Sequence, residues 1–235
     1  MIMAEKWKPK AIFYDSKKTL WDWSAVWTDA CARLLKKYKS DIEPAEFKRV
    51  WNFYHTYFNH IGAFGSNNAF QWNQQRALMH AFRYFNIVGD PEDVSFMEKA
   101  WKDVKPFPEV PAELKKQQKL CKVFTFSNIE RYYLDLLISH TDGFKPDFVG
   151  DMMTAGCSKP NPRAYYWVLE QTGLTVNDVL YCACPQWDLQ GALAIGMKTI
   201  WLNRDNEPLT GAQPDYIVSD LKGVTKVVES YFKRK

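Results

Sequence analysis

Four short polar segments contain the residues of this chain whose types and spacing could do chemistry. They are residues 15–20 (DSKKTL), 127–128 (SN), 159–162 (KPNP) and 187–188 (WD). Asp15 is a candidate nucleophile, because a carboxylate can displace a leaving group at carbon and form an ester that water then hydrolyses at its carbonyl. Lys159 would hold Asp15 in its charged form and stabilise negative charge later in the reaction. Asp188 could balance the charge of Lys159 and help to orient the hydrolytic water.

Neighbouring residues in these segments suit substrate binding. Thr19 lies one turn after Asp15 and could hold a carboxylate or ester oxygen. Ser127 and Asn128 could bind a substrate carboxylate through adjacent backbone N–H groups at a helix start, although the same pair could simply cap that helix. Lys17 is a further candidate for substrate binding, but its spacing does not decide whether it faces a pocket or solvent. Because an Asp after a strand is usually a turn residue or helix cap, the assignment of Asp15 depends on the four segments together.

Apolar runs alternate with helical patterns and predict the elements that must position these residues. The runs at 11–14, 123–126, 147–150, 179–182 and 198–202 are typical of buried strands. The helical pattern at 162–171 begins with Pro162, an ordinary start signal for a helix. The helical pattern at 187–195 ends before Gly196, an ordinary stop signal. This alternation predicts an α/β fold with a doubly wound parallel sheet, Rossmann-like, whose ligands gather outside the carboxyl ends of the strands.

A long stretch between the first and second predicted strands has helical periodicity throughout. Apolar residues recur at helical spacing within 25–34, 47–58, 69–85 and 94–101. We therefore expect an α/β core domain made of residues 1–20 and 106–235, and a helical cap domain made of residues 21–105. An insertion at this point would lie over the carboxyl ends of the strands, where it could exclude water from Asp15.

The composition is that of a folded globular protein and narrows the classes of partner. Hydrophobic residues make up 46% and charged residues 25% of the 235 residues, and the net charge of +4 contains no long basic block that would indicate a nucleic-acid surface. No apolar run approaches the roughly 20 residues needed to cross a bilayer, and no signal peptide follows the first residues, so we expect a cytoplasmic protein. Five cysteines form no disulfide pattern, and Cys182 and Cys184 lack a second ligand pair for a metal.

Taken in order, the four segments resemble the motifs of the haloacid dehalogenase-like superfamily, and most closely its L-2-haloacid dehalogenase branch. Residues 159–165 (KPNPRAY) and 187–192 (WDLQGA) match two of the branch's motifs, and 50–51, Phe70, Trp72 and 76–78 follow its cap pattern. The resemblance extends from residue 11 to about 204. It implies a metal-independent hydrolase that forms a covalent aspartyl intermediate with a small carboxylic acid, without a cofactor and often as a homodimer. It also implies that Tyr165 and Trp187 complete the pocket wall, although Tyr165 taken alone would be core.

Several positions depart from this pattern. Phosphatases of the superfamily carry a second Asp where this chain has Lys17, and an acidic residue for Mg²⁺ where it has Cys184, which argues against a magnesium phosphatase. Ala183 and Pro185 replace the Ser and Asn of the dehalogenase branch, and Asn52 replaces an arginine that helps to accept the departing halide. Loss of that arginine removes a cation that would stabilise an anionic leaving group and would repel a positively charged one.

Three interpretations remain open from the sequence. The first is a 2-haloacid dehalogenase-like hydrolase. The second is a hydrolase of the same type that opens a strained ring, such as azetidine-2-carboxylate or an epoxide acid; the neutral Asn52 suits a departing ammonium, which aromatic rings of the cap could hold. The third is a non-catalytic protein that binds a small acid, an interpretation motivated by Asn52, Ala183 and Pro185.

Overall fold

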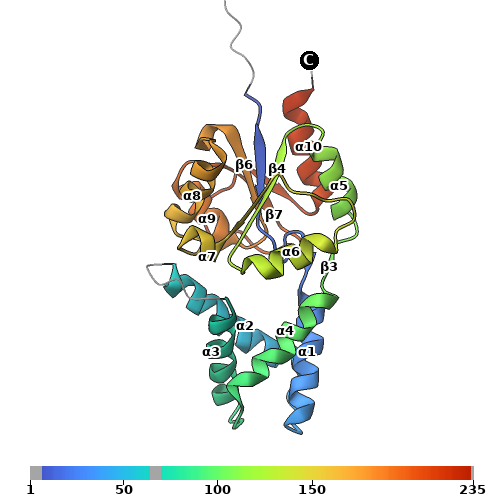
Figure 1. The fold of residues 1–235 in the computed structure, drawn as a ribbon, viewed down its shortest axis with the longest axis vertical. Helices are drawn as coiled ribbons and strands as arrows, with labels where there is room; N and C mark the ends of the chain where they lie inside the picture. The colour runs from blue at the N-terminus through green and yellow to red at the C-terminus, as the bar shows by residue number, and fades with distance from the viewer. Residues whose placement is uncertain (1–6, 64–69, 234–235) are drawn as a thin grey trace, which may run out of the picture.

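The computed structural model describes residues 7–63 and 70–233, and a six-stranded parallel sheet forms its centre (Figure 1). The strand order is β5-β4-β1-β6-β7-β8, with bounds β1 Ala11–Tyr14, β4 Lys122–Ser127, β5 Phe148–Asp151, β6 Val179–Ala183, β7 Lys198–Leu202 and β8 Tyr216–Val218. Tyr14 lies opposite Thr125 of β4 and Cys182 of β6, so Asp15 leaves the sheet at its middle. The predicted α/β fold class is confirmed.

Helices cover both faces of the sheet. α5 (Val110–Gln117), α6 (Arg131–Ser139) and α10 (Leu221–Phe232) pack with the side chains of Ile12 and Tyr14. α8 (Pro162–Thr172) and α9 (Gln186–Ala194) pack on the other face with Phe13, and the short α7 (Met152–Ala155) follows β5. Because helices cover both faces, every residue of β1 is apolar and buried, as in other parallel sheets.

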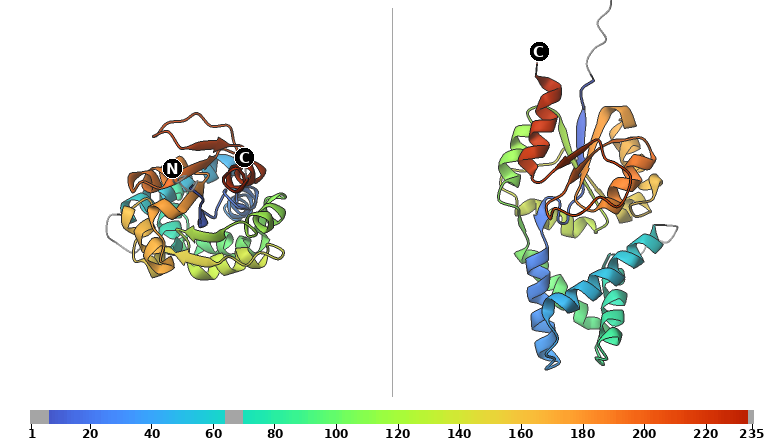
Figure 2. Two further views of the ribbon diagram at one scale, coloured as in Figure 1. Left: turned by 90° about the horizontal axis from the view of Figure 1, so that it is seen from above. Right: turned by 180° about the vertical axis from the view of Figure 1, so that it is seen from behind.

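The cap leaves and rejoins the core through a two-stranded antiparallel ribbon. β2 (Trp21–Asp22) pairs with β3 (Lys105–Pro106), and between them lie α1 (Ser24–Lys37), α2 (Pro44–Gly62), α3 (Phe70–Tyr84) and α4 (Ser95–Ala100), with 3-10 turns Pro91–Val94 and Trp101–Asp103 around α4. The apolar stripes of the cap helices meet in an aromatic core that includes Trp27, Phe47, Trp51 and Phe82. Figures 1 and 2 show the cap at the end of the sheet toward which β1 runs.

The five predicted strands are present within one residue at each end, but other elements were not anticipated. These are β8, the β2–β3 ribbon, α5 and α10, which are short or lie outside the patterns used above. Residues 1–6 and 234–235 of the predicted core, and 64–69 of the predicted cap, lie outside the described residues, so the helix expected at 69–85 is seen from Phe70. Across the described part of the chain, no helix is both long enough and apolar enough for a bilayer.

Candidate active site

Asp15 lies at the carboxyl end of β1 with both carboxylate oxygens held by donors. The ammonium of Lys159 donates to Oδ1 at 2.9 Å, and the hydroxyl of Thr19 donates to Oδ2 at 2.9 Å. The backbone N–H of Cys184 donates to the Thr19 oxygen at 2.9 Å, which fixes the hydroxyl for its bond to Asp15. The residue is only 6% exposed and lines a cavity, so one carboxylate is both oriented and accessible from one side.

Lys159 precedes α8 and is fully buried beneath Asp15. Besides Asp15, its ammonium contacts Asp188 at 2.5 Å, the hydroxyl of Tyr181 at 2.9 Å and the carbonyl oxygen of Phe126 at 3.0 Å. These acceptors exceed its three N–H donors, so every N–H has a partner. Burial alone would lower the pKa of Lys159, but the charges of Asp15 and Asp188 raise that pKa above its ordinary value. The lysine is therefore held as a cation.

Asp188 lies in the first turn of α9 and is closed off from the cavity. Its Oδ2 accepts from Lys159, while its Oδ1 accepts from the hydroxyls of Tyr165 at 2.5 Å and Tyr181 at 2.8 Å. Burial raises the pKa of the Asp188 carboxyl, and Lys159 opposes that rise. Because Asp188 is 0% exposed and both of its oxygens accept hydrogen bonds, it is placed to fix Lys159, and its role in orienting a hydrolytic water stays a prediction.

The resemblance implied that Tyr165 completes the pocket wall, but Tyr165 lies behind Asp188 and is not among the residues that line the cavity. Its hydroxyl contacts both the side chain and the backbone oxygen of Asp188, and the residue is 0% exposed. Tyr181 takes part in the same network but was not singled out from the sequence. A tyrosine in the middle of a buried strand resembles core, and the only signal was that a buried phenol needs a hydrogen-bond partner.

Ser127 and Asn128 line the cavity, but their side chains are occupied within the protein. The hydroxyl of Ser127 bonds that of Ser16. The amide of Asn128 donates to the carbonyl oxygen of Lys159 and accepts from its N–H, both at 2.8 Å. The expectation that the pair stands at a helix start is wrong, because α6 has Glu130 as its N-cap and begins at Arg131.

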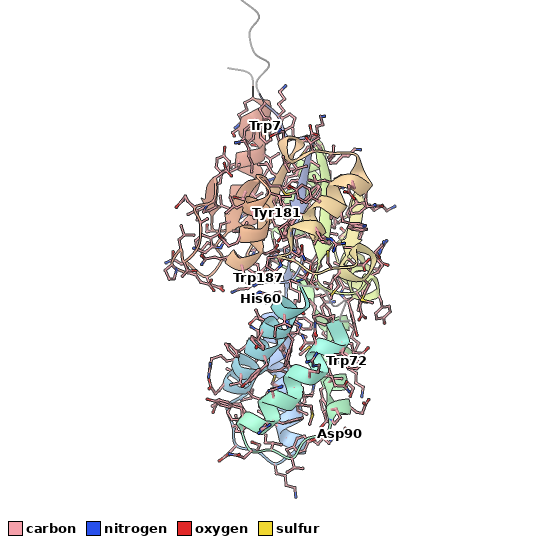
Figure 3. All side chains as sticks on the ribbon, turned by 90° about the vertical axis from the view of Figure 1, so that its left-hand side faces the viewer. Trp7, His60, Trp72, Asp90, Tyr181 and Trp187 are labelled. Carbon is pink, nitrogen blue, oxygen red and sulfur yellow. The ribbon has the colours of Figure 1, made fainter. Side chains whose placement is uncertain are left out.

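A cavity of about 700 Å³ lies between the core and the cap, and the remaining predicted site residues line it. Lys17, Asn52 and Trp187 all line it, as do the backbone or side chains of Cys184 and Pro185. The indole of Trp187 from the core packs edge-on against His60 of α2, with ring centroids 4.9 Å apart, so the pair joins core and cap (Figure 3). Asn52 is exposed and therefore stands toward solvent.

Lys17 is directed into the cavity between two aromatic rings. Its ammonium lies 4.8 Å from the ring centroid of Phe70 and 5.6 Å from that of Trp23. Burial lowers the pKa of the Lys17 amine to about 8, the charge of Asp15 opposes this shift, and Lys159 adds to it. Within residues 7–63 and 70–233 the ammonium has no hydrogen-bond or ion-pair partner, so a cation is available in the cavity.

A buried polar chain in the cap also borders the cavity and was not anticipated. Nδ2 of Asn59 donates to Nε2 of His55 at 3.1 Å, and Asn73 donates to the oxygen of Asn59 at 2.9 Å. Burial lowers the pKa of His55 well below its ordinary value, and the charge of Lys17 adds to the effect. The two polar residues four positions apart on the apolar face of α2 were the available sequence signal.

The donors around Asp15 suit an anionic nucleophile rather than a metal. Its neighbours are an ammonium group and a hydroxyl group, and Ala183, Cys184 and Pro185 supply no carboxylate beside it. Over the part of the chain that is described, no three His, Cys, Asp or Glu side chains converge in a way that would hold a metal ion.

No protein-family model matches the chain, but individual proteins do. It is 28% identical over 167 residues to (S)-2-haloacid dehalogenase of Pseudomonas sp. (strain YL), covering 68% of this chain and 71% of that protein. It is 24% identical over 227 residues to haloacetate dehalogenase H-2 of Moraxella sp. (strain B), covering 94% and 98%. The crystal structure of an L-2-haloacid dehalogenase superposes with a TM-score of 0.84 at 19% identity, covering 94% of this chain and 99% of the other.

A six-stranded parallel sheet with a helical cap is the fold of the haloacid dehalogenase structures. The chain is thus similar in sequence to dehalogenases that act on small halogenated acids, and it has the fold of the L-2-haloacid dehalogenase structure.

Proposed function

We propose that this protein is a hydrolase in which Asp15 displaces a leaving group from carbon of a small carboxylic acid, in the manner of a 2-haloacid dehalogenase. One observation carries the proposal: the Asp15 carboxylate faces the cavity while Lys159 and Thr19 each hold one of its oxygens. A carboxylate fixed in this way is oriented for attack on a bound carbon.

The reaction has two steps at Asp15. In the first, one carboxylate oxygen forms a bond to the substrate carbon, and the bond from that carbon to the leaving group breaks. In the second, water attacks Cγ of the Asp15 ester, and negative charge develops on the carbonyl oxygen. The donors already placed on the two Asp15 oxygens, Lys159 and Thr19, would stabilise that charge without rearranging.

Lys17 supports the handling of an anionic substrate. It is a cation on the cavity wall, coupled electrostatically to Asp15, and has no protein partner among the described residues. Its charge can attract the carboxylate of the acid or stabilise a departing anion, which is the function that an arginine at position 52 would otherwise serve. The similarity to a (S)-2-haloacid dehalogenase and to a haloacetate dehalogenase supports this substrate class.

Ring opening by the same Asp15 chemistry is the second candidate. Two features of the cavity wall favour it. Asn52 is neutral and would not repel a positively charged ring nitrogen as an arginine would, and the rings of Trp23 and Trp27 could hold such a nitrogen by cation–π contact. The free ammonium of Lys17 counts against a leaving group that departs with positive charge, such as the nitrogen of azetidine-2-carboxylate.

The experiment compares wild type, Asp15→Asn and, as a control, Asp135→Asn, which changes an exposed carboxylate on α6. Each is mixed with 2-bromopropionate, azetidine-2-carboxylate and glycidate, quenched in acid and analysed by mass spectrometry, first as intact protein and then as peptides. We expect turnover and an adduct on the peptide containing Asp15 in wild type and the control, and neither in Asp15→Asn, whose fold should be intact. Saturable binding of these acids without any adduct would instead favour the non-catalytic small-acid binding protein.

A further inference from the structure

The loop that carries Thr19 contains no glycine, although one of its residues has a left-handed backbone. Residues 15–22 read DSKKTLWD, and Lys18 has φ 64°, a conformation that costs free energy and that surrounding contacts must offset. Thr19 is 0% exposed, and its hydroxyl oxygen lies 2.9 Å from Oδ2 of Asp15 and 2.9 Å from the backbone nitrogen of Cys184. The course of this loop therefore decides whether the Thr19 hydroxyl reaches the nucleophile.

Arg204, the second residue after β7, holds the backbone of Thr19. Its Nη2 and Nε both donate to the Thr19 carbonyl oxygen, at 2.9 Å and 3.3 Å. In residues 7–63 and 70–233 no other group donates to this oxygen. The guanidinium is a rigid planar fork, so two N–H groups on one oxygen fix the direction of the peptide as well as its distance.

The same guanidinium also holds the second chain connection between core and cap. Its Nη1 donates to Glu109 at 2.8 Å, and its central carbon lies 3.8 Å from the ring centroid of Phe107, within cation–π range. Phe107 in turn donates its N–H to the carbonyl oxygen of Leu20 at 3.1 Å, beside the β2–β3 ribbon. The side chain of Arg204 is 10% exposed and that of Glu109 14%, so solvent screens this pair less than an ion pair on the surface. Both chain connections are thus held at one point.

Building on the covalent mechanism proposed above, we propose that Arg204 is a positioning residue of the reaction: through the Thr19 carbonyl, it keeps the Thr19 hydroxyl on Oδ2 of Asp15. Arg204 does not line the cavity and so contacts no substrate. Asp15 needs the Thr19 donor twice. Before attack the hydroxyl fixes the orientation of the carboxylate, and during ester hydrolysis it stabilises charge on the carbonyl oxygen. Loss of the guanidinium should therefore lower kcat and leave KM nearly unchanged.

Asp205, the next residue along the chain, provides a matched control. It pairs with Lys18 of the same loop, but the two side chains are 52% and 41% exposed, and exposed pairs contribute little. Asp205 neither lines the cavity nor contacts Thr19. Asp205→Asn therefore removes a contact between the same two loops without disturbing the support of the Thr19 carbonyl.

The kinetic test measures kcat and KM with 2-bromopropionate in wild type, Arg204→Lys, Thr19→Val, the double variant and Asp205→Asn. Lysine keeps the positive charge, but its single nitrogen cannot replace a fork that serves both Glu109 and Thr19. Because small misplacements at a reacting group can cost up to about 100-fold, we expect Arg204→Lys to lose about tenfold or more in kcat, with KM within about twofold of wild type. Asp205→Asn should match wild type in both constants. If Arg204→Lys does not fold, Glu109→Gln takes its place, because it keeps the arginine but removes the charge that orients Nη1. We expect a smaller loss of kcat in the same direction, and a wild-type kcat there counts equally against the proposal.

The double variant separates positioning from a purely structural role. Thr19→Val removes the hydroxyl that Arg204 positions, so adding Arg204→Lys should lower kcat by less than about twofold more. An arginine that only supported the fold would lower the urea midpoint of each enzyme and give kcat losses that multiply. Wild-type kcat in Arg204→Lys, or a further loss of about tenfold on top of Thr19→Val, would overturn the proposal.

A measurement without substrate tests the same contact. The N–H of Cys184 donates to the Thr19 hydroxyl, so its hydrogen exchange, followed by ¹⁵N NMR, reports whether Thr19 stays in place. We expect this exchange to be at least about tenfold faster in Arg204→Lys, while the N–H of Val123, which donates to Asp147 near the other end of β4, keeps its rate. Equal acceleration at both amides, or none at Cys184, would overturn the proposal. If wild type forms no adduct with 2-bromopropionate, the covalent mechanism fails, and the exchange rates still show whether Arg204 holds Thr19.

Discussion

Removing the two phenol donors to Asp188 tests the network that fixes Lys159. Tyr181 donates to Oδ1 of Asp188 at 2.8 Å, and Tyr165 donates to the same oxygen at 2.5 Å. Hydrogen bonds to a charged partner contribute about 1.5–3 kcal/mol each. Tyr181→Phe should cost an amount near the lower end of that range, because Lys159 keeps three other acceptors. Tyr165→Phe should cost about the same or slightly more, since its hydroxyl also contacts the Asp188 backbone oxygen.

The double variant gives the sharper result. Either single variant leaves Oδ1 with one donor, whereas the double variant leaves it with none among the described residues, in a side chain that is 0% exposed. We therefore expect the double variant to lose more stability than the two singles together, with a coupling of about 1 kcal/mol or more. Urea unfolding measures this through a lower midpoint at an unchanged slope. An additive double variant would refute the reasoning, because it would mean that water or a rearranged group reaches the orphaned oxygen.

Three further predictions concern single features. Gly191→Ala should destabilise the fold by about 1–3 kcal/mol in urea unfolding. The added methyl group would lie 2.5 Å from the Tyr165 ring and hydroxyl and 2.7 Å from the backbone oxygen of Pro160. The control Gly211→Ala should cost less, because its methyl group meets only a flexible glutamine side chain. Asn52→Arg should raise 2-bromopropionate turnover and lower azetidine-2-carboxylate turnover, by severalfold rather than by orders of magnitude, because the exposed position screens the charge; no change in either rate would mean that this side chain does not act on the bound substrate. Turnover should persist in excess EDTA, because Lys159 supplies the charge that a metal would, and loss of activity that Mg²⁺ restores would favour a metal-dependent reaction instead.

The position of Asp15 at a strand end could be anticipated from a local signal, whereas the assignment of Lys159 and Asp188 depended on the order of the four segments along the chain. An apolar run that ends in a charged residue predicts a strand end, and the carboxyl ends of neighbouring parallel strands converge in space. The sequence also indicated the helical cap, because helical periodicity survives in each of its segments. These are properties that a short window of sequence retains.

The remaining features depend on tertiary contacts that no short window contains. Asn128 contacts Lys159 across 31 residues, and Tyr165 contacts Asp188 across 23, so their roles could not be read from spacing. Whether Lys17 faces the cavity depends on the rings of Trp23 and Phe70, which lie on the cap. A local pattern classifies these side chains only as buried or exposed, because their role in the site depends on contacts between the cap and the core.

Labelling with ¹⁸O-water under single-turnover conditions tests the covalent role of Asp15 most directly. Enzyme in excess over 2-bromopropionate or glycidate is allowed one turnover, after which the product and the Asp15 peptide are analysed by mass spectrometry. Hydrolysis at Cγ predicts that the label enters the Asp15 carboxylate and that the first product is unlabelled. Label in the first product with none in Asp15 would mean that water attacks the substrate itself, and it would contradict a covalent intermediate.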